Sequence, residues 1–329
     1  MTEGFLPVRK EQGFTSMDVV AKLRGILHMR KIGHAGTLDP MAEGVLLIAL
    51  GSATRAISLL PDREKEYAAR ITLGKATDTE DIWGNVTEIS DNIVSSEELR
   101  QTILSFAGGY DQVPPMVSAK KVGGKKLYQL ARAGQVVERQ PVPVKIPEIE
   151  VLSVGCNQAE FRVRCSEGTY IRSLCRDIGE KLSMPACMSA LTRTEACGIR
   201  IDQALTLDEI QRKADAGTIA ENIVSIEQML RAYPAVTVTE AWDLRVRNGS
   251  AFDETAVAAV PGEMNASEED LPDADIPGAD IRKGSISGDG TPQTPYRRVY
   301  LPDGTFQAVY RIGEADGIYR PVKILGGRN

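Results

Sequence analysis

The sequence has no long hydrophobic run. None of its apolar stretches approaches the roughly 18 residues that a membrane-spanning helix needs, so a membrane-spanning protein is excluded. The first residues carry charge early and lack the apolar stretch of a signal peptide, so we expect none. Histidine is limited to His28 and His34 and no CxxC pair occurs, which argues against a zinc site. The five cysteines, spread over 156–197, are predicted to be reduced thiols of a cytoplasmic protein.

An excess of positive charge is also missing, since the 329 residues carry a net charge of −6. A negative total argues at first against a nucleic-acid partner. The charge is uneven, however: residues 253–289 hold ten acidic residues and two basic ones, which leaves the rest of the chain at +2. Residues 117–145 hold seven basic residues and one acidic one. Because a phosphate backbone responds to charge within a Debye length of about 10 Å, the total excludes nothing.

The hydrophobic pattern predicts helices and strands in irregular alternation. Helical spacing of apolar residues predicts a helix over 15–29 with Ser16 as its N-cap, and a short helix after Ser52. Further helices are expected from Ser95 and from Gly168-Thr169. Strands are expected at these ranges: 45–50 (fully buried), 66–73 (half-buried), 146–154 and 159–165. No regular βαβ period occurs, so we predict an α+β fold with a mixed, largely antiparallel sheet rather than a Rossmann fold.

Composition changes near residue 232, and the length suits about two domains. We expect a larger domain at 1–232 with a basic insertion at about 110–145, ending in a helix at 207–231. A smaller domain at 233–329 would carry an acidic insertion at about 253–295. In it, Thr237 is expected to cap a short helix, and strands at 297–301, 305–311 and 318–324 predict a small β-barrel with a hairpin at Pro302-Asp303-Gly304.

The segment Gly33–Leu46, GHAGTLDPMAEGVL, places an aspartate directly before the buried strand. Its glycines permit tight turns of the backbone and close approach of a ligand, and Pro40 restrains Asp39 to an extended conformation. A carboxylate is thereby presented at the edge of a core. On these grounds alone Asp39 is either a functional carboxylate or a cap for the next segment.

This segment resembles, over its whole length, the G-H-x-G-T-L-D-P-x-A-x-G-V-L motif of TruB-type tRNA pseudouridine synthases. Further blocks resemble that family in the same order along roughly residues 4–232: KEQGFTS at 10–16, GSATR at 51–55, KEY at 65–67, GKATDT at 74–79, the Pro114–Tyr128 insertion, and CSEGTYIRS at 165–173. The C-terminal region resembles the PUA barrel of the family more weakly. The resemblance implies a pseudouridine synthase core followed by a PUA-like barrel.

The family resemblance implies isomerisation of uridine-55 in the T-loop of tRNA. The N-glycosidic bond breaks, the base rotates and a carbon–carbon bond forms. The base must first be flipped out of its stack, at a cost of a few kcal/mol. The reaction is redox-neutral, and neither a Walker A nor a GxGxxG sequence occurs, so we expect no cofactor and no metal. The expected partner is the T-arm of tRNA, and we expect a monomer.

Three residues carry the predicted chemistry. Asp39 would be the nucleophilic carboxylate. Arg172 would keep it ionised in a dry pocket, unless it is a solvated arginine on a helix face. Tyr67 would stack on the flipped uracil and act late as a general base, unless it is only a core tyrosine.

Other positions would bind the substrate. His34 would fill the space left by the flipped base or simply pack, and Tyr170 and Leu191 would line the base pocket, with core packing nearly as good an account of Leu191. Lys10 would support the motif loop, touch phosphate, or lie solvated at the surface. The lysines expected to contact phosphate are Lys121, Lys125 and Lys126 of the basic insertion.

Two other functions fit the same residues. A non-catalytic tRNA-binding or folding factor could keep this scaffold, although binding alone needs no buried carboxylate beside RNA. A related synthase acting on another RNA within an accessory complex is disfavoured, because the chain has no lysine-rich tails and the barrel is small.

The basic insertion gives a first test. We expect Lys125→Glu combined with Lys126→Glu to weaken tRNA binding and to flatten its salt dependence, because each phosphate contact adds about 0.7–0.9 to the slope of log K against log salt. Binding titrations at several salt concentrations measure that slope. An unchanged slope would remove the insertion from the RNA interface.

Overall fold

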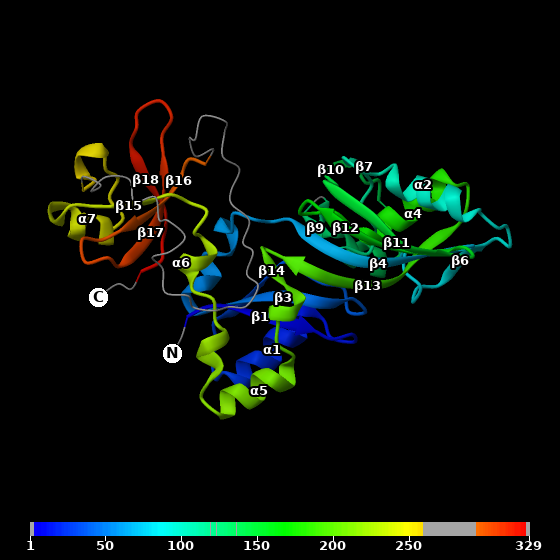
Figure 1. Ribbon diagram of the computed structural model, residues 1–329, viewed down its shortest axis with the longest axis horizontal. Helices are drawn as coiled ribbons and strands as arrows, with labels where there is room; N and C mark the ends of the chain where they lie inside the picture. The colour runs from blue at the N-terminus through cyan, green and yellow to red at the C-terminus, as the bar shows by residue number, and fades with distance from the viewer. Residues whose placement is uncertain (1–2, 119, 123, 136, 259–293, 327–329) are drawn as a thin grey trace. The chain divides into compact units, whose positions relative to one another are not determined.

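The computed structural model describes residues 3–118, 120–122, 124–135, 137–258 and 294–326. The chain forms two compact units: unit 1 is residues 1–39, 45–62 and 197–329, and unit 2 is residues 40–44 and 63–196. Figure 1 shows the elements of both. Within the described residues, no helix is both long and apolar enough to cross a membrane. Most of the acidic segment, at 259–293, lies outside the described residues.

Unit 2 is built on an antiparallel sheet in the order β13-β4-β12-β11. Helix α4 packs on β13 and β4, and α2 packs on β11 (Figure 1). The elements of this unit are β4 (Lys65–Leu73), β5 (Lys75–Thr77), β6 (Val86–Ile89), α2 (Ser96–Leu104), β7 (Tyr110–Gln112), β8 (Lys121–Val122), β9 (Lys125–Lys126), α3 (Leu127–Arg132), β10 (Val142–Val144), β11 (Glu148–Gly155), β12 (Gln158–Cys165), α4 (Ile171–Lys181) and β13 (Ala186–Ala196).

Strands β4 and β12, in the centre of this sheet, each bury one face. In β4 the side chains of Tyr67, Ala69, Ile71 and Leu73 are buried, while Arg70 is exposed. This confirms the half-buried strand predicted at 66–73, and β12 likewise confirms the strand at 159–165. The sheet is mixed, because Glu43 and Gly44, which belong to unit 2, pair in parallel with Thr192 and Arg193.

Unit 1 holds the N-terminal elements and everything after β13. They are β1 (Gly4–Lys10), α1 (Ser16–Ile26), β2 (Ile32–Ala35), β3 (Glu43–Leu50, of which 45–50 lie in this unit), β14 (Ile199–Arg200), α5 (Leu207–Asp215), α6 (Ile226–Met229), β15 (Ala235–Thr237), α7 (Asp243–Arg247), β16 (Tyr296–Tyr300), β17 (Phe306–Ile312) and β18 (Tyr319–Ile324). Strand β3 is buried along nearly its whole length, as predicted for 45–50, and pairs with β2. Helix α1 packs on β2 and α5.

The C-terminal strands form a four-stranded sheet in the order β15-β16-β17-β18. Phe252 stacks on Tyr319 and contacts Tyr310, which places an aromatic cluster in its core. The three C-terminal strands were predicted within one or two residues, and Leu301 and Thr305 close their hairpin. The described residues form no closed barrel, so the predicted barrel is not confirmed.

Several local predictions were wrong. The N-cap of α1 is Thr15 rather than Ser16, and 207–231 is interrupted after α5 at Gly217, whose φ is +73°. Thr237 ends β15 and caps no helix; Thr239 occupies the N-cap position instead. The helix after Ser52 consists of two 3₁₀ turns. Strand β13 was not predicted at all.

The cysteines are free thiols. Cys156 is exposed and the other four are buried. Burial raises the pKa of the Cys165 thiol to about 11, so this thiol is protonated at neutral pH.

Gly44 offers a test of the pairing between β3 and β13. A Cβ at this position would lie 2.2 Å from the backbone oxygen of Arg193, and its φ of +111° disfavours any side chain. We expect Gly44→Ala to lower the free energy of unfolding by about 3 kcal/mol or more. Urea denaturation measures the loss. Gly155→Ala, where a Cβ meets nothing within 4 Å, is the control and should change little; equal losses would contradict the pairing as described.

Candidate active site

Asp39 lies at the point where the chain leaves unit 1 for unit 2. Its side chain is half-buried, and the preceding Leu38 is 4% exposed. The hydroxyl of Ser16, itself 2% exposed, accepts from the backbone N–H of Leu38 at 2.9 Å and donates to its carbonyl at 3.2 Å. One side chain at the start of α1 therefore fixes both backbone groups of the residue before Asp39.

Lys10 supports the same region from the end of β1. Its side chain is 0% exposed, and Nζ donates to the carbonyls of Phe14 at 2.7 Å and Glu11 at 3.0 Å. The alternative of a solvated surface lysine is therefore wrong. A buried ammonium on these carbonyls holds the turn that leads into Thr15 and Ser16.

His34 lies in β2, opposite Ile48 of β3, and is partly exposed. It is thus carried by a strand, where only a glycine-rich segment was expected.

Tyr67 lies in β4 with 7% of its surface exposed. In the sheet it is opposite Val163 of β12 on one side and Arg193 of β13 on the other. Leu191, 6% exposed, is opposite Ala69 and therefore shares the face of Tyr67 as a diagonal neighbour. The structure thus brings together two of the residues that the sequence assigns to the base.

The neighbouring residue Glu66 belongs to an ion cluster that ties three strands together. Arg164 of β12, 6% exposed, donates to Glu66 at 3.0 Å and to Glu195 of β13 at 2.9 Å. The hydrogen bonds with Glu195 raise the pKa of Arg164 further, so the guanidinium stays charged. This cluster fixes the register of β12, β4 and β13 beside Tyr67.

Arg172 is buried in the first turn of α4, with 3% of its surface exposed. It donates to the carbonyl of Thr79 at 2.8 Å and to that of Val117 at 2.9 Å. The alternative of a solvated helix arginine is therefore wrong. Its guanidinium lies 3.8 Å from Asp81, an acidic partner that sequence analysis missed. The nearest indication of Asp81 in the sequence was the family-like block GKATDT, which ends two residues before it.

Gln112 holds the residue that precedes α4. This side chain, 1% exposed, accepts from the backbone N–H of Tyr170 at 2.8 Å and donates to its carbonyl at 3.0 Å. It also donates to the hydroxyl of Tyr110 at 2.7 Å, and that hydroxyl donates to Asp177 at 2.6 Å. Burial and the Asp177 carboxylate raise the pKa of Tyr110, which keeps its proton. Tyr170 is therefore fixed in place through its backbone.

The backbones of Lys121, Lys125 and Lys126 belong to the β8–β9 hairpin, and their side chains lie outside what the structure describes.

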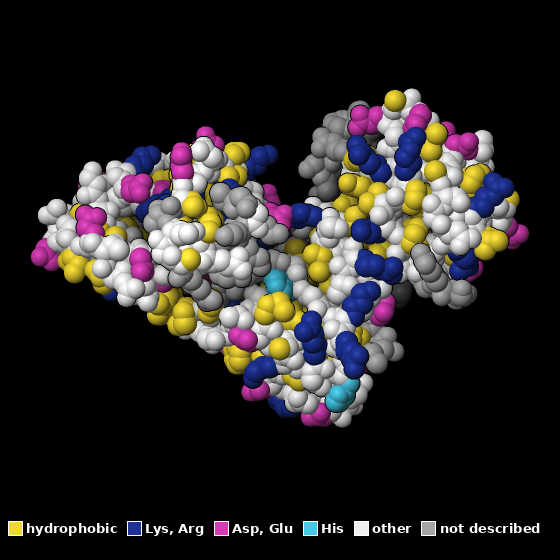
Figure 2. Space-filling view, turned by 180° about the vertical axis from the view of Figure 1, so that it is seen from behind, with side chains coloured by type: hydrophobic (Ala, Val, Ile, Leu, Met, Phe, Trp, Pro, Cys, Tyr) yellow, Lys and Arg dark blue, Asp and Glu magenta, His cyan; other side chains and the backbone are white. Residues whose placement is uncertain are grey.

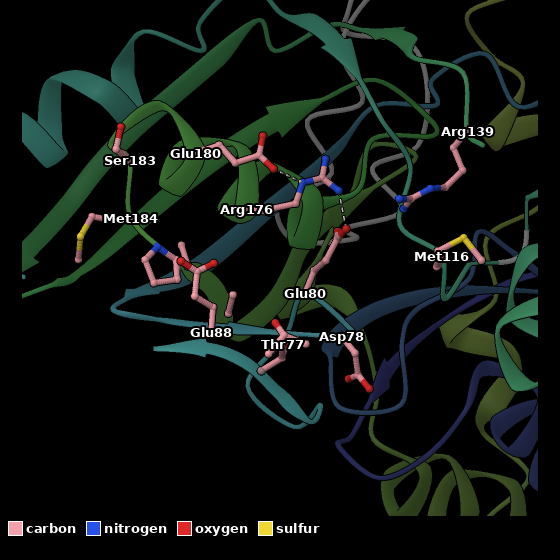
Figure 3. Close-up of a pocket in the computed structure, with 14 residues that line it drawn as sticks. Thr77, Asp78, Glu80, Glu88, Met116, Arg139, Arg176, Glu180, Ser183 and Met184 are labelled. Atoms are coloured by element: carbon pink, nitrogen blue, oxygen red, sulfur yellow. Dashed lines mark hydrogen bonds and ion pairs between the residues drawn. The ribbon is translucent and has the colours of Figure 1, made fainter. Parts of the chain in front are cut away.

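A cavity of about 430 Å³ lies in unit 2 (Figure 3). Its lining includes Arg176, which is paired with Glu80 and Glu180, and Arg139. None of the predicted site residues whose side chains the structure describes lines it. The pocket predicted for the flipped base is therefore not this cavity.

The chain is similar over 99% of its length to the protein in "Structure of H/ACA RNP bound to a substrate RNA containing 2'-deoxyuridine", with a TM-score of 0.67, 22% identity and 86% of that chain covered. It is as similar to a chain of "Crystal structure of the archaeal box H/ACA sRNP Nop10-Cbf5 complex", with a TM-score of 0.67, 22% identity and coverage of 99% of this chain and 87% of that one. At these identities the likeness shows a shared core fold.

Sequence comparison identifies the family. Residues 24–171 match the TruB family pseudouridylate synthase N-terminal domain, and residues 172–232 match the tRNA pseudouridylate synthase B C-terminal domain. The proteins named tRNA pseudouridine synthase B from Lachnoclostridium phytofermentans and Bacillus pumilus are similar to this chain. The first is 39% identical over 98% of this chain and 99% of its own length, and the second is 42% identical over 82% and 88%. The chain belongs to the TruB family of pseudouridylate synthases, which are isomerases.

The bonds between Ser16 and Leu38 generate a prediction. Ser16→Ala removes one partner from each of two buried backbone groups, so we expect about 1–3 kcal/mol lower stability and a fall in kcat of roughly 10-fold or more as Asp39 loses its fixed position. Pseudouridine formation under single-turnover conditions measures the rate.

Thr15→Ala is the matched control. It removes the N-cap of the same helix, at a cost of about 1 kcal/mol, without touching Leu38. If the two variants lowered kcat equally, the bonds to Leu38 would have no part in positioning Asp39.

Proposed function

We propose that the chain converts uridine-55 in the T-loop of tRNA to pseudouridine. The observation that carries this proposal is the unbroken match of Gly33–Leu46, with Asp39 at its centre, to the catalytic motif of the family to which the chain belongs. The names of the relatives support tRNA as the substrate. Two of these relatives align over 98% of this chain.

Asp39 acts as the nucleophile at the ribose once the uridine is flipped out of its stack. Such a carboxylate has to stay ionised in a dry site, and Arg172 supplies the positive charge. The burial of Arg172 supports this pairing, because the cation is already out of bulk water. Asp81, 3.8 Å from the guanidinium, helps to hold Arg172 in place.

Tyr67 stacks on the detached uracil. After the carbon–carbon bond has formed, its phenolic oxygen takes the proton from C5 while the hydroxyl proton passes to N1 of the uracil. Its place beside Leu191 on one sheet face supports a joint role of the two residues at the base; its burial alone fits the alternative of a core tyrosine equally well. His34 and Tyr170 complete the base site. No step needs an oxidant, a reductant or a cofactor.

Binding of RNA draws on basic side chains in two places. The insertion at about 110–145 carries the lysines already named. A second group is exposed in the N-terminal part of unit 1, and Figure 2 shows Lys and Arg side chains gathered on that part of the surface; the exposed basic residues there include Lys22, Arg24, Arg30, Lys31 and Arg55. Both groups suit a phosphate backbone.

We further propose that 1–232 is the catalytic domain and 233–329 a PUA-like domain interrupted at about 253–295. The match of the family domains, which ends at 232, and the separate core around Phe252 support this division. A monomeric state and a cytoplasmic location stay predictions.

Asp39→Asn tests the proposed function. We expect the variant to bind an unmodified T-arm stem-loop as the wild type does and to lose pseudouridine formation by roughly 1,000-fold or more, because the amide is no nucleophile. Chemical mapping of pseudouridine in the product measures the reaction and locates the base.

Asp91→Asn, the same change at an exposed carboxylate, should leave the reaction intact. A near wild-type rate in Asp39→Asn would overturn the mechanism. Wild-type protein that binds the stem-loop without modifying it would favour the non-catalytic binding factor instead.

A further inference from the structure

Trp83 is one of two tryptophans in the chain, and 44% of its surface is exposed. It lies between β5 and β6, two residues after the end of the TDTED stretch. A tryptophan is most often largely buried, and an exposed indole in a folded segment often marks a contact with another molecule. The question is whether this segment is held in one conformation and what lies beside it.

Hydrogen bonds hold the segment to β13. The N–H of Ile82 donates to the carbonyl of Met188 at 2.9 Å, and the N–H of Met188 donates to the carbonyl of Glu80 at 3.1 Å. Across the segment, the hydroxyl of Thr77 donates to the carbonyl of Asp81 at 2.5 Å. Trp83 is therefore presented from a fixed backbone, which lowers the entropic cost of using its ring.

The carboxylate of Asp81 connects Trp83 with Arg172. One oxygen, Oδ1, accepts from the backbone N–H of Trp83 at 3.2 Å and from the hydroxyl of Thr79 at 2.8 Å. The other oxygen, Oδ2, lies 3.8 Å from the Arg172 guanidinium. The Asp81 carboxylate thus links the backbone of Trp83 to the guanidinium of Arg172, the cation of the proposed reaction.

The charged residues around Trp83 indicate which part of an RNA it would contact. Asp78, Glu80 and Asp81 are all acidic; the first accepts from Asn85, the second pairs with Arg176 as Figure 3 shows, and the third pairs with Arg172. Because arginines neutralise Glu80 and Asp81 and Asp78 is exposed, the segment offers no unpaired positive charge from these residues to a phosphate. The face of a nucleobase carries no charge and stacks well on an indole.

We propose that Trp83 is a stacking site for a base of the substrate RNA, next to the uridine that is flipped out. This inference rests on the proposed function, because it takes RNA as the substrate. The contact is made by the ring alone, so it contributes affinity without releasing counterions. In this it differs from the lysines of the basic insertion.

Binding of an unmodified T-arm stem-loop to the full chain tests the proposal. We expect Trp83→Ala to raise Kd by about 10-fold and Trp83→Phe to restore most of the affinity. The slope of log Kd against log salt should not change in either variant. Leu152→Ala, at another exposed apolar side chain of unit 2, is the control and should leave Kd unchanged.

Fluorescence provides a second measurement that does not depend on affinity. In Trp242→Phe the only remaining indole is Trp83, and we expect the stem-loop to quench its emission. In Trp83→Phe, where only Trp242 remains, the stem-loop should quench much less. Trp242 lies in the C-terminal core near Phe252, with Arg245 over its ring.

The outcomes separate this inference from the proposed function. Unchanged Kd in Trp83→Ala together with unquenched Trp83 would overturn the stacking site, even if the wild type makes pseudouridine. A flattened salt slope in Trp83→Ala would also overturn it, since the contact would then involve phosphate. Quenching and aromatic rescue in a protein that forms no pseudouridine would uphold the stacking site and refute the proposed activity.

Discussion

The guanidinium of Arg172 has almost no access to solvent, and a charge taken out of water costs several kcal/mol unless it is hydrogen-bonded and paired. Two segments of unit 2 meet this requirement: the one before β6 supplies the Thr79 carbonyl and Asp81, and the one after β7 supplies the Val117 carbonyl. Both are irregular, and the bonds to Arg172 join them to each other. The position of Trp83 follows from the same cation, because its backbone is bonded to the acid that pairs with Arg172.

The irregular backbone beside the proposed site residues has a related requirement, because its buried N–H and C=O groups have no partner strand to bond to. The chain meets it twice in the same way. Ser16 satisfies both backbone groups of Leu38, and Gln112 satisfies both backbone groups of Tyr170. A side chain that can both donate and accept is needed at each place. This explains polar residues at positions that are otherwise surrounded by core.

Sequence reasoning recovered what periodicity and motif encode. The buried run of β3 and the alternation of β4 were visible in the pattern of apolar residues. The motif around Asp39 indicated the family. Strand β13 was missed because Ser189, Arg193 and other polar residues break its alternation, and because its β-bulges shift the register. Asp81 and Gln112 were missed because their partners lie 91 and 58 residues away, where no local pattern reaches.

The bonds between Ser16 and Leu38 also couple two elements of unit 1 in their dynamics. The amide of Leu38 has its acceptor on α1, so it exchanges with solvent only when the first turn of α1 opens or the loop moves away from it. The protection of this single amide therefore reports on the cooperativity of unit 1. An opening of α1 that carries the Ser16 hydroxyl away from Leu38 would also release the backbone beside Asp39.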